Sequence, residues 1–222
     1  MTITAFAFDL DGTLVDSIHD LARAANAMRA ELGLPALDSA TVEGYVGDGS
    51  ASLVARTLAD DHAAEYTGTA EQHKAMALFN AHYLAGLTIA TKFYPRVQEV
   101  LHTLHERGVP LAIVTNKPER FTLPLLREMG VFEHFDVIVG GDTASDKKPA
   151  AAPILLAAEK LGVPVDQLLM VGDSQNDILA ARAAGCPVVA VSYGYGEDAG
   201  ALGADSVIHD FRELLEFLGD ER

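Results

Sequence analysis

The sequence of 222 residues contains a single cysteine, Cys186, and few basic residues. One cysteine excludes an intramolecular disulfide and is typical of proteins from a reducing compartment. Lysine and arginine number 16 against 32 aspartates and glutamates, which gives a net charge of −16. Nucleic acids and anionic membranes are bound by basic patches, so this charge argues against both as partners.

Long hydrophobic runs are also missing. No apolar run reaches 18 residues, and the first residues show neither the basic nor the apolar region of a secretory signal. We therefore expect a cytoplasmic protein without a membrane partner, present as a monomer or a homodimer. Hydrophobic residues make up 49% of the chain, which is enough for a sizeable core.

The first fifteen residues carry the strongest local pattern. Residues 3–8 form an apolar run that predicts a buried strand. Asp9 and Asp11 follow, and an extended chain points both to the same side, with their Cα atoms about 6–7 Å apart. A cation with oxygen ligands, such as Mg²⁺, would relieve their repulsion. Gly12 allows a sharp turn whose N–H groups can hold a phosphate; the alternative is a capping loop with two surface aspartates.

The remaining chain divides into two patterns. Residues 17–88 predict only helices, at about 17–32, 39–45, 50–58 and 69–87, with capping boxes at Ser17–Asp20 and Thr69–Gln72. Beyond residue 94, helices alternate with strands expected at 110–115, 135–139, 168–171, 188–191 and near 207, and a last helix is expected at 210–218. This alternation predicts an α/β protein. Its parts are a Rossmann-like parallel-sheet core (1–16 and 89–222) and an α-helical cap domain (17–88) inserted after the first strand.

Polar clusters follow the later strands as well. They are Thr115-Asn116-Lys117, Lys147-Lys148-Pro149 and Gly172-Asp173-Ser174, with Asp177 one turn further on. Sites in open α/β sheets form at the carboxyl ends of strands, so we expect these clusters to meet the two N-terminal aspartates. Taken singly, each cluster could be a helix cap or a solvated loop. Their joint occurrence favours a common site.

The run FDLDGTLVDS and these three clusters, in this order, resemble the four motifs of the haloacid dehalogenase (HAD) superfamily. The resemblance extends from Phe8 to about Tyr195 and implies a Mg²⁺-dependent phosphatase. It implies that Asp9 is the nucleophile that forms an aspartyl-phosphate. Asp11 would protonate the leaving oxygen and then deprotonate water.

The resemblance also implies roles for residues in the later clusters. Thr115, the backbone N–H of Asn116, Gly12 and Lys148 would bind the phosphoryl group. The metal would be held by Asp9, the backbone carbonyl of Asp11, Asp173 and, through water or from the second shell, Asp177. The chain departs from the usual motifs at Ala151, which replaces a proline, and at Arg96, which replaces a glycine of the linker and is expected to stiffen it.

Within the superfamily, the chain looks most like the phosphoglycolate phosphatases. The similar segments are Gly44–Gly49, Gly172–Cys186 and Ser192–Glu197. This likeness implies a small phosphorylated metabolite, 2-phosphoglycolate, as substrate, and a mobile cap in which Gly47 and Gly49 contact it. Because the core motifs contact only the phosphoryl group and the metal, we expect residues 17–88, together with the hinges, to select the leaving group.

Other functions remain open at this point. A pyrophosphatase, a phosphosugar phosphatase or a phosphomutase would use the same core motifs. A protein of another class, a non-catalytic phosphate-binding module, would have no physical need for the full set of charged residues.

Overall fold

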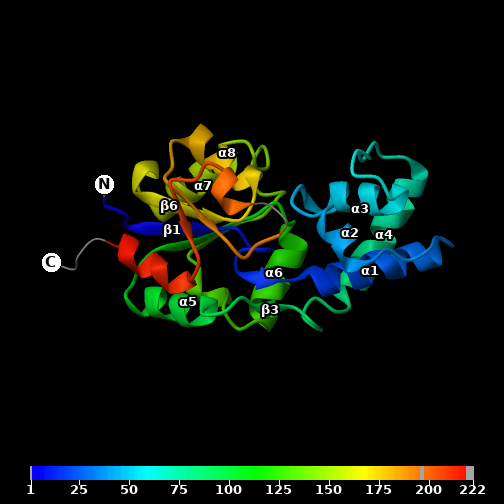
Figure 1. The fold of residues 1–222 in the computed structure, drawn as a ribbon, viewed down its shortest axis with the longest axis horizontal. Coiled ribbons are helices and arrows are strands. Elements are labelled where there is room, and N and C mark those ends of the chain that lie inside the picture. The colour runs from blue at the N-terminus through cyan, green and yellow to red at the C-terminus, as the bar shows by residue number, and fades with distance from the viewer. Residues whose placement is uncertain (1, 196–197, 219–222) are drawn as a thin grey trace. The chain divides into compact units, whose positions relative to one another are not determined.

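The computed structural model describes residues 2–195 and 198–218 (Figure 1). The chain divides into two compact units, residues 1–15 with 93–222, and residues 16–92. The predicted insertion, 17–88, lies inside the second unit; its separate role as a cap stays a prediction. Gly196 and Glu197, which belong to the motif expected at 192–197, lie outside the described residues.

A six-stranded parallel sheet forms the centre of the first unit, in the order β5-β4-β1-β6-β7-β8. The strands are β1 (Ala5–Phe8), β4 (Leu111–Val114), β5 (Val137–Val139), β6 (Leu168–Gly172), β7 (Val188–Val191) and β8 (Ser206–Ile208). The chain continues from β1 to β4 on one side and returns later to β6 on the other. The predicted α/β class with a parallel sheet is confirmed, and the strand order reverses at β1.

Strand β1 is buried on both faces of this sheet. Ala5 and Ala7 belong to the cluster of buried residues that includes side chains of α7 and α8. Phe6 and Phe8 lie on the opposite face, where the ring of Phe8 is 5.9 Å from that of Phe211, centroid to centroid. All four residues of the strand are fully buried. Burial on two faces explains why the sequence there is continuously apolar rather than alternating.

Four α-helices and four 3₁₀ segments accompany the sheet. They are α5 (Val97–Glu106), α6 (Glu119–Glu128), α7 (Ala152–Leu161), α8 (Gln175–Ala184), η1 (Phe132–His134), η2 (Val165–Gln167), η3 (Ala199–Ala201) and η4 (Phe211–Phe217). The last helix expected at 210–218 is confirmed as η4, which is a 3₁₀ helix. Its inward residues Phe211, Leu214 and Phe217 are three apart, which aligns them on one face at three residues per turn.

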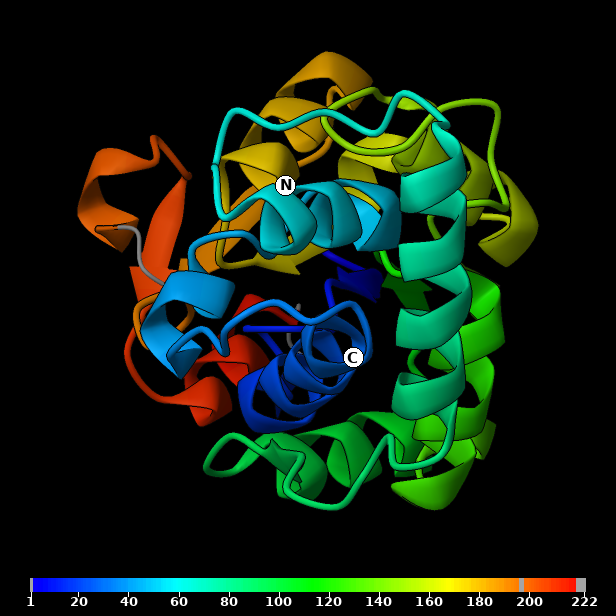
Figure 2. The same ribbon diagram turned by 90° about the vertical axis from the view of Figure 1, so that its right-hand side faces the viewer.

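Between residues 17 and 88, the second unit contains helices and no strand. They are α1 (Ile18–Glu31), α2 (Ser39–Glu43), α3 (Gly49–Ala59) and α4 (Ala70–Leu84). In Figure 2, α4 is the long blue-green helix on the right. The predicted capping box at its start is confirmed, since Thr69 Oγ1 accepts a hydrogen bond from Gln72 N at 3.2 Å. No helix in residues 2–195 and 198–218 is long and apolar enough to cross a membrane.

The capping box expected at Ser17 and Asp20 was wrong. Ser17 accepts no capping hydrogen bond, although it stands at the start of α1. Asp20 Oδ2 instead accepts hydrogen bonds from Ala90 N, Thr91 N and Thr91 Oγ1, each at 2.8 Å. The Asp20 carboxylate therefore makes tertiary contacts, whereas the local sequence predicted that it would cap the start of α1. It joins the last residues of this unit to its first helix.

Arg29 of α1 is almost fully buried and binds the end of α3. Its guanidinium contacts the carbonyl oxygens of Thr57 and, at 3.4 Å, Leu58, and donates to Pro35 O at 2.6 Å. The final carbonyls of a helix have no partner inside it and carry partial negative charge. Arg29 satisfies them and so connects two helices.

A two-stranded sheet lies where the chain passes between the units, formed by β2 (Val15–Asp16) and β3 (Lys92–Phe93). Shortly after β3, Arg96 adopts a left-handed conformation with φ of +68°. Glycine takes this conformation at no steric cost, whereas other residues lose about 1–2 kcal/mol. Arg96 thus keeps the backbone shape of the glycine that it replaces. The expected stiffening of the linker stays a prediction.

Candidate active site

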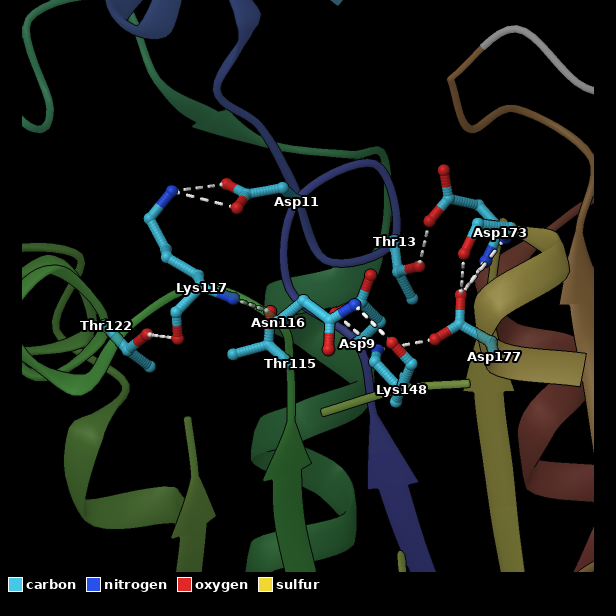
Figure 3. Close-up of polar contacts among 11 residues, drawn as sticks. Asp9, Asp11, Thr13, Thr115, Asn116, Lys117, Thr122, Lys148, Asp173 and Asp177 are labelled. Atoms are coloured by element: carbon cyan, nitrogen blue, oxygen red, sulfur yellow. Dashed lines mark hydrogen bonds and ion pairs between the residues drawn. The ribbon is translucent and has the colours of Figure 1, made fainter. Parts of the chain in front are cut away.

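Three neighbouring strands end at one edge of the sheet, and a polar residue follows each (Figure 3). The last residue of β1 is level with Ile113 of β4 and Val171 of β6. Asp9, Thr115 and Asp173 follow these strands directly or within one residue. The parallel register therefore places the expected clusters at a common edge, next to the point where the strand order reverses.

The centre of the site is a group of three carboxylates and one ammonium. Asp9, Asp173 and Asp177 each offer one oxygen, and these oxygens lie within 4.8 Å of one another. The Nζ atom of Lys148 lies 2.9 Å from Asp9 Oδ1 and 2.5 Å from Asp177 Oδ1. The Lys148 side chain is only 2% exposed. The charges of this group are therefore largely shielded from solvent and interact strongly.

Burial and mutual repulsion shift the pKa values of this group. Burial raises the pKa of Asp9 to about 6, against the attraction of Lys148. Burial and the nearby Asp9 carboxylate raise the pKa of Asp173 well above its usual value. Burial alone would lower the pKa of Lys148, but the Asp177 and Asp9 carboxylates outweigh it and raise the pKa. The single positive charge of Lys148 does not balance the negative charge of three ionised carboxylates.

Asp177 is fully buried, and both of its carboxylate oxygens contact other groups of the protein. Oδ1 faces Lys148, while Oδ2 accepts hydrogen bonds from Ser174 N at 3.1 Å and Ser174 Oγ at 2.7 Å. Ser174 caps α8, so Asp177 belongs to a capping box that fixes its rotamer. A Cβ at Gly172 would lie 2.3 Å from Asp177 Cγ, so only glycine fits there. Asp177 thereby positions Lys148.

Asp173 is held by Thr13 and Tyr195. Its Oδ1 accepts a hydrogen bond from Thr13 Oγ1 at 2.7 Å, and its Oδ2 accepts one from Tyr195 N at 2.9 Å. Glycines at positions 12 and 194 leave the space for this carboxylate. A Cβ added at Gly12 or Gly194 would approach Asp173 atoms to 2.2 Å. The loop after β1 therefore orients a carboxylate that follows β6.

The donor set fits a divalent cation. Asp9, Asp173 and Asp177 converge, and apart from the ion pair with Lys148, Asp9 Oδ1 is a buried oxygen without a hydrogen-bond donor. Carboxylate oxygens are the ligands that Mg²⁺ and Ca²⁺ prefer. Three carboxylates against one lysine leave two negative charges, which a divalent ion would balance. The side chain of Asp11, which the sequence grouped with the metal residues, is not part of this cluster.

The loops after β4 and β5 support the lysine. Asn116 Nδ2 donates a hydrogen bond to the carbonyl oxygen of Lys148 at 2.9 Å. Thr115 is buried, and its Oγ1 accepts a hydrogen bond from Lys117 N at 3.2 Å. Of the two adjacent lysines, Lys147 is exposed, whereas Lys148 points into the carboxylate cluster. This placement supports the choice of Lys148 made from the sequence.

Asp11 makes an ion pair that the sequence did not predict. Lys117 Nζ lies 2.8 Å from both carboxylate oxygens of Asp11, and the two side chains are 4% and 12% exposed. The sequence placed Lys117 and Ser174 in the polar clusters expected at the site but predicted no individual role for them, and it predicted none for Thr13. The sequence did indicate their location, because each of these residues stands close to a predicted site residue after a buried strand. It did not show which atoms they would contact.

Gly47 and Gly49 belong to the second unit. Their φ angles are +120° and +84°, and α3 begins at Gly49. These backbone angles explain the need for glycine at the turn between α2 and α3. The proposed contact of both glycines with a substrate stays a prediction.

The chain matches the family model of the haloacid dehalogenase-like hydrolases over residues 6–191. That match covers most of the chain, and together with the fold and the site it shows that the chain belongs to this family of hydrolases. The family resemblance seen in the sequence is confirmed.

Individual members of the family are similar over nearly their whole length. The chain is 49% identical to the phosphoglycolate phosphatase of Chromobacterium violaceum, covering 97% of this chain and 96% of that protein. It is 40% identical to the phosphoglycolate phosphatase of Yersinia pseudotuberculosis, covering 98% and 94%. The crystal structure of a predicted phosphoglycolate phosphatase from Haemophilus somnus superposes with a TM-score of 0.89 at 34% identity, covering 97% and 98%.

Proposed function

We propose that this hydrolase is a Mg²⁺-dependent phosphatase that converts 2-phosphoglycolate into glycolate and phosphate. The main support is the environment of Asp9 at the end of the central strand, where it pairs with a buried lysine and converges with two further carboxylates. Relatives at 40–49% identity that are named phosphoglycolate phosphatase support the choice of substrate.

Asp9 is the proposed nucleophile. One of its oxygens attacks phosphorus, and the bond between phosphorus and the leaving oxygen breaks, which gives an aspartyl-phosphate on Asp9. Asp11 donates a proton to the leaving oxygen in this step. In the second step Asp11 removes a proton from water, which attacks phosphorus and releases Asp9. The proton returned to Asp11 readies it for the next cycle.

The surrounding groups stabilise charge on the phosphoryl oxygens. Lys148 contacts Asp9 and stands where a transferring phosphoryl group would approach it. Thr115 Oγ1 and the N–H group of Asn116 are proposed hydrogen-bond donors to that group. The N–H of Gly12, which the sequence led us to expect there, instead donates to Val15 O at 2.9 Å within its own loop. A bound Mg²⁺, held by Asp9, Asp173 and the carbonyl of Asp11, would offset the charge of the reacting oxygens. Asp177 supports this site indirectly, because it holds Lys148 in place.

The test is a hydrolysis screen over small phosphorylated metabolites, with Mg²⁺ and with a chelator. We expect Mg²⁺-dependent phosphate release, with kcat/KM for 2-phosphoglycolate at least about tenfold above that for hexose phosphates. If pyrophosphate or a hexose phosphate is preferred, the substrate assignment fails. If phosphate transfer to a second sugar phosphate is seen, the protein is a phosphomutase. If no ester, including an aryl phosphate, releases phosphate, the protein is a non-catalytic binding module.

A further inference from the structure

Lys117 is held rigidly beside the proposed acid–base group. Its backbone N–H donates to Thr115 Oγ1 at 3.2 Å. Its carbonyl oxygen accepts hydrogen bonds from Gly141 N at 2.9 Å and Thr122 Oγ1 at 3.2 Å. These contacts hold the backbone at Lys117, and the ion pair with both oxygens of Asp11 holds the end of its long side chain (Figure 3). Lysine rotamer freedom is costly to remove, so a fixed lysine at this place indicates a defined task.

The geometry at Asp11 limits what Lys117 can contact. Nζ is 2.8 Å from each oxygen of Asp11, so it lies next to whichever oxygen transfers the proton. That oxygen must come within about 2.6–3.2 Å of the leaving oxygen. Lys117 is therefore beside the leaving group, whereas Lys148, between Asp9 and Asp177, is beside the phosphoryl group. The two lysines serve opposite ends of the bond that breaks.

The leaving group of 2-phosphoglycolate carries a carboxylate one carbon away from its leaving oxygen. When Asp11 binds that oxygen, the carboxylate falls within reach of the ammonium group that contacts Asp11. The chain has a net charge of −16, so a substrate with both a phosphate and a carboxylate needs local cations at both ends. Lys117 supplies the second cation, and contact with the substrate would also free Asp11 for proton transfer.

We propose that Lys117 binds the carboxylate of the leaving group and thereby selects carboxylate-bearing phosphomonoesters. This inference rests on the proposed function and deepens it. It also assigns part of the selection of the leaving group to Lys117 of the first unit, whereas the sequence led us to expect it from residues 17–88 and the hinges. Lys117 acts on specificity through a direct contact with the substrate, in addition to its ion pair with Asp11.

The test compares two substrates in a Lys117→Met variant. The substrates are 2-phosphoglycolate and ethyl phosphate, which has a methyl group in place of the carboxylate. A charge-assisted contact predicts that the variant loses about 10- to 100-fold more kcat/KM for 2-phosphoglycolate than for ethyl phosphate, mainly through KM. Lys117→Arg keeps the charge and should retain most of the preference. Lys160→Met, a change at an exposed lysine of α7, is the matched control.

Each outcome is decisive. Equal losses for both substrates would reduce Lys117 to a positioning residue for Asp11 and overturn the proposal, as would no loss for either. If Lys117→Met does not fold, the same ratio measured in Lys117→Gln and Lys117→Arg decides, because these variants differ in charge. Wild-type hydrolysis of ethyl phosphate without hydrolysis of 2-phosphoglycolate would refute the proposed substrate itself, which is a separate result.

Discussion

At the scale of single residues, the role of Asp9 gives the most direct prediction. Asp9→Asn should lower kcat by roughly 10³-fold or more, because an amide is a poor nucleophile and a weaker ligand. Steady-state hydrolysis of 2-phosphoglycolate measures the loss. Asp166→Asn, a change in η2, provides a control with the same chemical substitution. Activity within tenfold of wild type would rule out a covalent role for Asp9.

Asp173 provides a second prediction at this scale. Asp173→Asn keeps the size of the side chain and its place beside Thr13, but removes a charged ligand from the proposed metal site. We expect the Mg²⁺ concentration needed for half-maximal activity to rise at least about tenfold. A titration of rate against Mg²⁺ gives this value. An unchanged midpoint would show that Asp173 does not bind the metal.

The sequence predicted the charged centre of the site well and its supports poorly. Asp9 and Asp173 directly follow buried strands, and a parallel sheet brings such positions together whatever the details of packing. Lys148 comes from the loop between β5 and α7. The contacts of Thr13 and Lys117 depend on loop shapes that are set by glycines and by distant backbone groups. Such tertiary hydrogen bonds leave no period or spacing in the sequence.

At the scale of secondary-structure elements, Arg29 is the most informative position. Arg29→Met should lower the free energy of unfolding of the second unit by about 2–4 kcal/mol, because carbonyl groups at the end of α3 lose their charged donor. Denaturant unfolding followed by circular dichroism measures the change. Arg107→Met, at an exposed arginine that ends α5, should change stability by less than about 0.5 kcal/mol. Similar effects of both variants would contradict the assigned role of Arg29.

The elements themselves were predictable where one local signal dominated. The capping box of α4 was found from Thr69 and Gln72 because both of its partners are local. The box expected at Asp20 failed because Thr91, 71 residues away, competes for the same carboxylate. In η4, the spacing of Phe211 and Leu214 predicted a helix with both side chains on one face but did not separate an α-helix from a 3₁₀ helix, since both place residues three apart on one side.

At the scale of the whole molecule, the buried carboxylates couple stability to pH and to metal. The pKa of Asp9 is raised to about 6 and that of Asp173 is also raised, so the folded protein without metal holds protons that the unfolded chain releases. The free energy of unfolding gained from these bound protons is therefore present at low pH. It is lost as the pH rises from about 4 through 6 and beyond. For Asp9 alone the difference reaches about 3 kcal/mol.

Mg²⁺ should reverse this loss, because it binds the deprotonated carboxylates. We expect about 5 mM Mg²⁺ to raise Tm by several degrees at pH 7.5 and by clearly less at pH 5, where protons compete. Thermal unfolding at the two pH values, with Mg²⁺ and with a chelator, tests this. Asp173→Asn should remove most of the effect. An equal rise at both pH values would contradict a linkage through these groups.

The position of β1 has a consequence for biosynthesis. This strand leaves the ribosome first of the six, yet its two neighbours, β4 and β6, emerge only after residues 114 and 172. Until then the nascent chain carries a fully apolar strand with unpaired edges, whereas the helices of residues 16–92 can form from local contacts as they appear. Chaperone demand should therefore be greatest before β4 is complete at residue 114 and should persist until β6 is complete at residue 172. A ribosome stalled before residue 172 should display a helical segment beside an aggregation-prone N-terminus.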